Sequence, residues 1–197
     1  MGDDAALLAR IRGVDPVHAD TMSRQPTTFT VEPLPFYRSF KLVRADVELP
    51  HHPRQLLYGD SGSQLVYLSG KPDDLYRVND LDGLALPEAQ AAEYVRFFLA
   101  TTQSGEGRER ELAERPGDLH WLPGTEKDPS LQASRLEATA RLQPLTVSAA
   151  PGGYHVAVTV VEGQQLIELG LGVDARGRVV VESSRVVFED LPVAETL

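Results

Sequence analysis

Histidines are the residues of this chain best suited to acid–base or metal chemistry, because their side chains titrate near neutral pH and bind metals. The 197 residues include five of them: His18, His51, His52, His120 and His155. No two stand four positions apart, the spacing that places two ligands on one face of a helix. The chain has no cysteine, which excludes thiolate metal sites, iron–sulfur clusters and a cysteine nucleophile. We therefore expect no metal site and no cofactor.

The segment 59–63, Gly-Asp-Ser-Gly-Ser, is similar to the nucleophile segment of chymotrypsin-like serine proteases. That family places its catalytic histidine and aspartate far upstream, on a preceding barrel. Here His52 and His51 precede Ser61 by only nine and ten positions, and nothing earlier in the chain predicts a barrel. Aspartate, glycine and serine are also the residues that tight turns select. We interpret the segment as a hairpin turn and reject a protease function.

An enzyme whose site is assembled from distant loops is the alternative functional hypothesis. Its candidate catalytic residues are His51, His52, Asp60 and His120, which tertiary contacts would have to bring together. The activity expected of such a site is hydrolase-like.

Candidate binding residues surround the single tryptophan, in the polar segment 104–132. Asp118, His120 and Trp121 stand close together between Pro-Gly pairs, without a helix or strand period. Tryptophan combines a large apolar face with one hydrogen-bond donor, so it often anchors interfaces. A buried structural role for Trp121 is the competing interpretation. The segment itself can be a flap over the core, an edge strand or a binding loop.

Composition narrows the classes of partner. The net charge is −10, which argues against binding nucleic acid or an anionic membrane, because both require a concentrated basic surface. Hydrophobic residues make up 42% and charged residues 24%, as in ordinary folded domains. No apolar run approaches the length of a membrane span. We expect a soluble, cytoplasmic protein.

The residues that must position any site are best defined in the last third of the chain. Residues 136–193 predict a four-stranded antiparallel meander, because runs rich in Val, Ile and Leu alternate with turns containing Gly. Alternation places Glu168, Gly170 and Gly172 on one face of the third run. We interpret the two glycines as a bend in the sheet rather than as a ligand platform.

A helix is predicted over 87–103. Tyr94, Val95 and Phe98 recur at helical spacing there, Pro87 suits a helix start, and Gly105 follows where the helix should stop. Before it, residues 27–82 predict a first β region that includes a strand at 75–79. Residues 1–26 predict a flexible arm with at most a short helix, which Asp15-Pro16 would end.

Together these elements predict an α+β fold: antiparallel meanders with one principal helix packed on a curved sheet, in a single domain over 27–197. A helix ahead of a long meander is the order seen in cystatin-like folds, an analogy that concerns the fold alone. Because no complete catalytic, metal or cofactor motif is present, we expect a non-catalytic protein. Its expected partner is another protein or a small apolar ligand.

Overall fold

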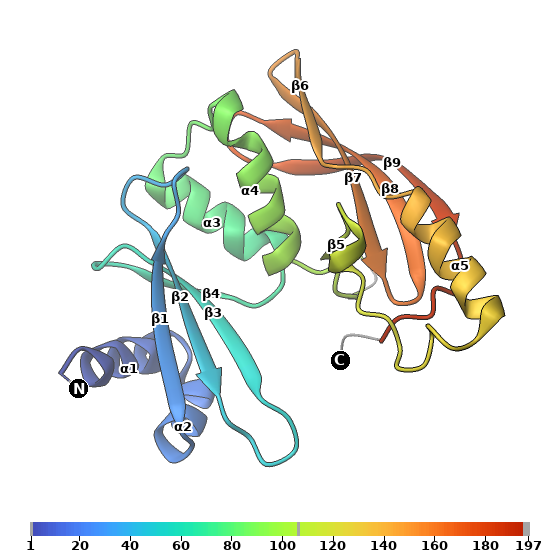
Figure 1. The fold of residues 1–197 in the computed structure, drawn as a ribbon. Coiled ribbons are helices and arrows are strands. Elements are labelled where there is room, and N and C mark those ends of the chain that lie inside the picture. Colours follow the sequence, from blue (N-terminus) through green and yellow to red (C-terminus); the bar gives the residue numbers. More distant parts are fainter. Residues whose placement is uncertain (1, 106, 195–197) are drawn as a thin grey trace. The chain divides into compact units, whose positions relative to one another are not determined.

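The computed structural model describes residues 2–105 and 107–194. Within these residues, five α-helices and nine β-strands form an α+β protein with two antiparallel sheets, which confirms the predicted fold class (Figure 1). The chain divides into two compact units, Met1–Leu84 and Ala85–Leu197, instead of the single domain expected over 27–197.

The first unit has a four-stranded sheet in the order β1-β2-β3-β4. Each strand runs antiparallel to its neighbour, so that Ala45 on the second strand lies between Phe29 and Leu56. The elements of this unit, in chain order, are α1 (Gly2–Val14), α2 (Pro16–Arg24), β1 (Thr27–Pro33), β2 (Lys41–Val47), β3 (Arg54–Asp60), β4 (Leu65–Leu68) and α3 (Pro72–Asp82).

The N-terminal segment is two helices, α1 and α2, in place of the flexible arm expected for 1–26. Ile11, Ala19 and Met22 are buried in a core cluster with one face of the sheet. Asp15 starts α2 by accepting a hydrogen bond from the backbone N–H of His18. The Asp-Pro pair therefore begins a helix as well as separating two, because proline fits the first helical turn, where no N–H is needed.

The predicted strand at 75–79 is wrong, since these residues lie in the helix α3. Pro72 opens this helix, and Gly83 ends it with a left-handed φ of 66°. A Cβ on Gly59 of β3 would lie 3.0 Å from Cγ2 of Val78. The absent side chain of Gly59 thus lets α3 pack closely on the sheet, on the face opposite to α1 and α2.

The second unit has a five-stranded antiparallel sheet with the path β5-β7-β8-β9, and β6 also pairs with β7. Its last four strands form the predicted four-stranded meander (Figure 1). The elements of this unit are α4 (Glu88–Thr101), β5 (Glu111–Leu112), the 3₁₀ turn η1 (Pro116–Asp118), α5 (Pro129–Ala140), β6 (Thr146–Ala150), β7 (Gly153–Glu162), β8 (Gln165–Asp174) and β9 (Val179–Phe188).

The meander begins later than predicted, because residues 136–140 belong to α5 and the first strand starts at Thr146. Asp128 caps α5 by accepting a hydrogen bond from the N–H of Ser130, and Pro129 follows it. The same helix-start signal as in α2 therefore occurs here. The polar segment 104–132 contains the short edge strand β5, one of the alternatives that the sequence left open.

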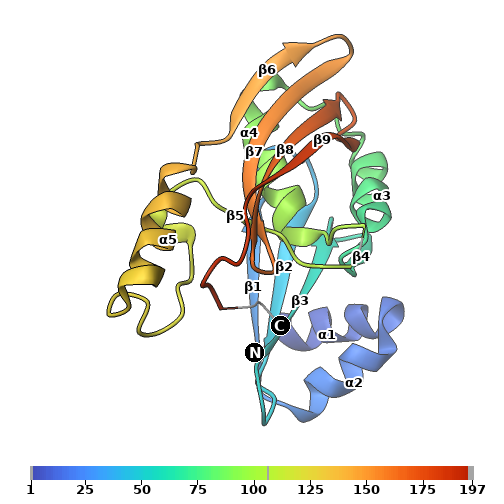
Figure 2. The same cartoon turned by 90° about the vertical axis from the view of Figure 1, so that its right-hand side faces the viewer.

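The predicted helix over 87–103 is confirmed as α4. Tyr94, Val95 and Phe98 are buried, and the Tyr94 hydroxyl donates a hydrogen bond to the carbonyl of Gly177. This helix contacts β5, β6 and β7. Figure 2 shows the bend of the paired strands β6 and β7 in this unit, as expected for a curved sheet.

A second core cluster lies at the far end of the same sheet. There Ala138 of α5 packs with Val161, Leu166, Leu191 and Val193, all of which are buried. No helix in the described part of the chain is both long and apolar enough to cross a bilayer.

Candidate functional site

The structure does not bring the predicted catalytic residues of the first unit together. His51 and His52 are exposed in the turn between β2 and β3, three and two residues before the start of β3 at Arg54. Asp60 is the last residue of the same strand. At a rise of about 3.3 Å per residue, the two ends of this strand are about 20 Å apart. Asp60 therefore cannot act on a substrate together with either histidine of this turn.

The carboxylate of Asp60 is engaged in a structural ion pair. Arg10 on α1 donates to it from Nη1 over 2.8 Å and from Nη2 over 2.5 Å, and the N–H of Gly62 donates over 2.6 Å. Burial raises the pKa of Asp60, but the hydrogen bonds from Arg10 and Gly62 outweigh burial and leave it below the ordinary value. Asp60 thus connects α1 to β3.

Of the predicted binding residues of the second unit, Asp118 and Trp121 make structural contacts and His120 is exposed. The carboxylate of Asp118 accepts hydrogen bonds from the backbone N–H groups of Glu114 and Arg115 and closes the η1 turn. Trp121 is half-buried against the cluster around Leu191, and its backbone bridges to Val193. The side chain of His120 is exposed.

The indole ring of Trp121 nevertheless has one unusual feature. Its Nε1 is buried and has no hydrogen-bond partner in the described part of the chain. Beside the ring, the guanidinium carbon of Arg135 lies 5.3 Å from the ring centroid, in cation–π range. These contacts hold the loop against α5, so they support the structural interpretation of this residue.

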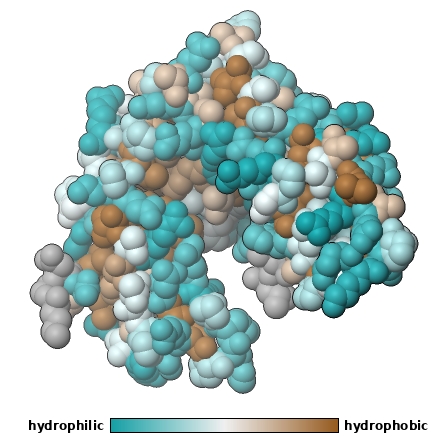
Figure 3. All heavy atoms as spheres, viewed as in Figure 1, coloured by the Kyte–Doolittle hydropathy of each residue, from teal (hydrophilic) through white to brown (hydrophobic). Residues whose placement is uncertain are grey.

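The described residues contain no cluster of side chains suited to binding a metal ion. No group of three or more His, Asp or Glu side chains there is arranged to hold a metal ion. On the face seen in Figure 3, hydrophobic and hydrophilic residues of each unit are interspersed. Hydropathy alone therefore does not mark a binding site on this face.

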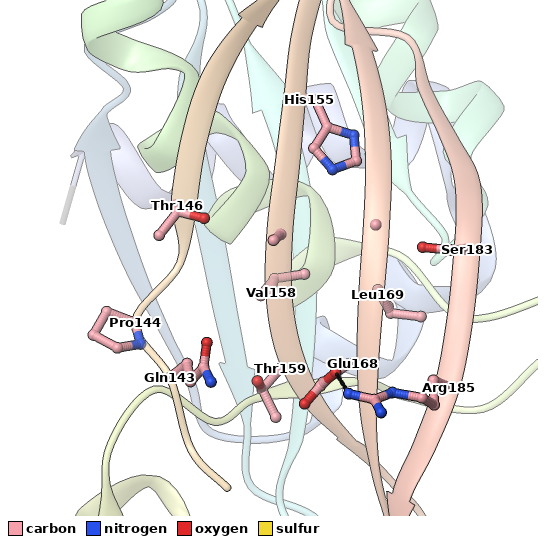
Figure 4. Close-up of a pocket in the computed structure, with 12 residues that line it drawn as sticks. Gln143, Pro144, Thr146, His155, Val158, Thr159, Glu168, Leu169, Ser183 and Arg185 are labelled. Carbon is pink, nitrogen blue, oxygen red and sulfur yellow. Dashed lines mark hydrogen bonds and ion pairs between the residues drawn. The ribbon is translucent and has the colours of Figure 1, made fainter.

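A hollow with a cavity volume of about 340 Å³ lies on the sheet of the second unit. It opens on the face that carries the side chains of His155, Glu168 and Arg185, which we call the polar face (Figure 4). The helix α4 lies behind the sheet in this view. The residues that line the hollow are Gln143, Pro144, Thr146, His155, Ala157, Val158, Thr159, Glu168, Leu169, Gly170, Ser183 and Arg185.

Strand register determines which side chains meet on the polar face. Gly170 at the centre of β8 lies opposite Ala157 of β7 and Ser183 of β9. A Cβ on Gly170 would lie 2.5 Å from Oγ of Ser183 and 3.3 Å from Cε1 of His155. Glycine is therefore needed here so that these two side chains can converge over β8.

A second glycine makes room for a carboxylate. A Cβ on Gly172 would lie 2.5 Å from Oε1 of Glu182. Glu182 is the extra residue of a β-bulge, because Leu171 pairs with Val181 whereas Gly170 pairs with Ser183. The bulge turns the side chain of Glu182 toward the polar face, where it approaches His155 of β7.

The charged groups around the hollow are paired with one another. Nδ1 of His155 lies 2.8 Å from Oε2 of Glu182, and Arg185 donates a hydrogen bond to Glu168 over 2.5 Å. Both pairs are partly exposed at the sheet surface. The two carboxylates of these pairs, Glu182 and Glu168, thus each have a basic side chain as partner.

Glu182, His155 and Ser183 are the residue types of a Ser-His-Glu relay. A relay requires the serine hydroxyl to bond to the imidazole nitrogen that the carboxylate leaves free. The described contacts include no hydrogen bond between Ser183 and His155, and all three residues are exposed. The arrangement therefore holds the imidazole but lacks an activated nucleophile.

Only part of the hollow can be found from the sequence. The pattern Glu168, Gly170 and Gly172 on one strand face is visible there, but two glycines on one face are also typical of a bend in the sheet. The positions of Glu182 and Arg185 depend on the β9 register and its bulge, which no local signal reveals.

Comparison of the chain with protein-family models, with curated proteins and with solved structures returned no match.

Proposed function

We propose that this chain is a non-catalytic binding module whose hollow on the polar face holds a small, uncharged, hydroxyl-rich ligand. The observation that carries the proposal is the internal pairing of charge, His155 with Glu182 and Arg185 with Glu168. An anion would have to displace Glu168 from Arg185, and a cation would have to displace Arg185 from Glu168. A neutral ligand needs neither exchange.

The lining supports a polar ligand rather than the apolar one that the sequence left as an expectation. Carboxylates accept more than one hydrogen bond, and a guanidinium has five N–H donors, so each pair keeps capacity after its mutual contact. The hydroxyls of Thr146 and Ser183 and the amide of Gln143 add groups that both donate and accept. Sugars and polyols present the same mixture.

The size of the hollow supports a small ligand. Small-molecule sites occupy about 300–1,000 Å³, and this cavity of about 340 Å³ lies near the lower limit. A single pyranose or cyclitol ring fits this scale. The apolar atoms of Pro144 and Ala157 provide contact surface for the C–H face of such a ring.

The test is a titration of the isotope-labelled full chain, followed by backbone amide chemical shifts. The probes are D-glucose and myo-inositol as polyols, inorganic phosphate as an anion, and octanoate as an apolar molecule. We expect saturable shifts at Gly170 and Ser183 with at least one polyol. The proposal is contradicted if only phosphate or octanoate gives saturable shifts. It is also contradicted if none of the probes does.

A matched pair of variants locates the binding. His155→Ala removes one side-chain hydrogen bond and should weaken polyol binding by about tenfold, the equivalent of about 1.4 kcal/mol. His52→Ala makes the same change on the first unit, where the side chain is exposed in a turn, and should leave the affinity unchanged. Equal effects of both variants would exclude the hollow as the site.

A hydrolase is the second candidate function. Its candidate site is the contact between Glu182 and His155 next to Ser183, which replaces the catalytic residues predicted from the sequence. Its test is 4-nitrophenyl acetate hydrolysis together with fluorophosphonate labelling. Labelling of the wild type that is lost in Ser183→Ala, with loss of hydrolysis, would replace the binding proposal by an acyl-transfer mechanism.

A further inference from the structure

The last strand, β9, is a long and exposed edge of the second sheet. Within the described residues it pairs only with β8. Every residue from 180 to 186 is exposed, and the exposed fractions of Val180, Val181 and Val186 are 64%, 46% and 41%. An open edge with apolar side chains presents unpaired backbone groups to another strand. This edge is therefore suited to adding a strand.

The sequence of this edge is complementary to itself. Residues 180–187 read Val-Val-Glu-Ser-Ser-Arg-Val-Val, so reversing the order exchanges only Glu182 and Arg185. When two copies pair antiparallel, the first half of each strand faces the second half of the other. Valines then face valines, and Glu182 faces Arg185 at both ends. Such a surface fits a twofold, self-complementary contact.

The bulge at Glu182 makes this pairing compatible with the faces of the sheet. In a regular strand, residues such as Val181 and Val186 point to opposite faces, because five positions separate them. The extra residue restores the match, since Val181 lies opposite Leu171 and Val186 opposite Ile167, and those two share a face. The bulge thus allows each valine to meet its counterpart on the same side.

A twofold axis at Ser184 satisfies all of these pairings. Arg185 then faces both Ser183 and Glu182 of the second copy, as one residue faces two at a bulge. Val186 faces Val181 of the second copy, and Val187 faces its Val180. Opposite charges directly across strands stabilise a sheet, and like charges there destabilise it.

We propose that two copies of this chain pair antiparallel along β9 about this axis, joining their sheets into one. The second copy is the occupant because it supplies the complementary charge at both ends of the edge. The pairing covers the exposed valines and places the two hollows on the same face of the joined sheet. It does not depend on what the hollow binds.

The experiment is sedimentation equilibrium of the full chain over a range of concentrations. We expect the wild type to reach twice the 21.6 kDa chain mass. Arg185→Glu replaces the two complementary Glu182–Arg185 pairs of the interface by two pairs of carboxylates, and the variant should sediment as one chain. Arg141→Glu makes the same charge change at an exposed residue that follows the end of α5, and it should leave the dimer intact. A wild type that stays monomeric up to millimolar concentration overturns the proposal.

Exchanging the charges at positions 182 and 185 distinguishes a variant that has lost the dimer contact from one that has lost its fold. Glu182→Arg should also be monomeric, but the double variant Glu182→Arg/Arg185→Glu should dimerise again, although it has lost both original ion pairs within the chain. The two single variants, each monomeric, should form a heterodimer when mixed in equal amounts. Far-ultraviolet circular dichroism of each variant checks the fold. If folded variants show no rescue in the double variant or the mixture, the proposed register is wrong.

Discussion

The hydroxyl of Tyr58 on β3 donates a hydrogen bond to Oδ2 of Asp15, 2.9 Å away, inside the first unit. The same carboxylate lies 2.7 Å from Nδ1 of His18 and caps α2. Burial, and then the hydrogen bond to Asp15, raise the pKa of Tyr58. One buried polar contact thus connects the N-terminal helices to the sheet.

We expect Tyr58→Phe to lower the free energy of unfolding by about 2 kcal/mol, because a charged acceptor loses a buried donor. Tyr67→Phe is the matched control on the adjacent strand, since none of residues 2–105 and 107–194 forms a hydrogen bond with its hydroxyl. It should cost at most about 0.5 kcal/mol. Denaturant unfolding measures both, and equal effects would show that the contact with Asp15 contributes nothing specific.

The ion pair between Arg10 and Asp60 predicts a pH-dependent contribution to stability. The pKa of Asp60 is lowered in the folded protein from its ordinary value of 3.8. The stabilisation is therefore complete above this ordinary value and is lost as the pH falls through the lower, folded value. Arg10→Met should cost about 1 kcal/mol at neutral pH, and the difference from wild type should shrink below about pH 3.8.

Unfolding in denaturant at neutral and at acidic pH tests this expectation. Arg24→Met is the control, because the Arg24–Asp20 pair is exposed on both sides, at 73% and 54%. It should show little cost at either pH. A constant deficit of the Arg10 variant at all pH values would mean that its aliphatic packing, not its charge, stabilises the unit.

Phe98 on α4 predicts a large packing contribution in the second unit. Its side chain is 6% exposed and lies on the same helix face as Tyr94 and Val95. Phe98→Ala should cost about 3–5 kcal/mol through lost burial and the cavity that remains. Glu93→Ala, at an exposed position of the same helix, should stay within about 0.5 kcal/mol. A cost below about 1 kcal/mol for Phe98→Ala would contradict the packing of α4 on the sheet.

Trp121 decides between the structural and the binding interpretation of its loop. We expect Trp121→Ala to cost about 2–4 kcal/mol, because the ring packs on the cluster around Leu191 and beneath Arg135. Trp121→Phe keeps the packing and removes the buried N–H without a partner, so it should cost under about 1 kcal/mol. An unchanged unfolding midpoint for Trp121→Ala would instead return the loop to its role as a binding candidate.

Local signals in the sequence determined the meander and the helix α4. Three hairpin turns of the meander contain glycines with left-handed φ, Gly152 at 82°, Gly163 at 61° and Gly177 at 73°, a conformation that other residues adopt at a cost. These turns separate the strands wherever the rest of the chain lies. In α4 the apolar spacing of Tyr94 and Phe98 defines a buried face in the same local way.

The helices α2, α3 and α5, which the sequence did not predict, also have local start signals, but the same signals are found in turns. Asp15-Pro16 and Asp128-Pro129 begin α2 and α5, and Pro72 opens α3. The same residue types also form turns, because proline fixes φ and aspartate accepts nearby backbone N–H groups in both settings. Whether these residues form a turn or begin a helix depends on how the segment that follows packs on a sheet.

The sequence by itself therefore determined the class of the fold and its turns, because those depend on conformations that single residues favour. It did not determine the division at Leu84 or the pairs that line the hollow. The contact between His155 and Glu182 joins β7 to β9 across 27 residues, and it exists because a bulge shifts the register at Glu182. Register and bulges follow from how whole strands pack, so only the tertiary structure decided which side chains meet on the polar face.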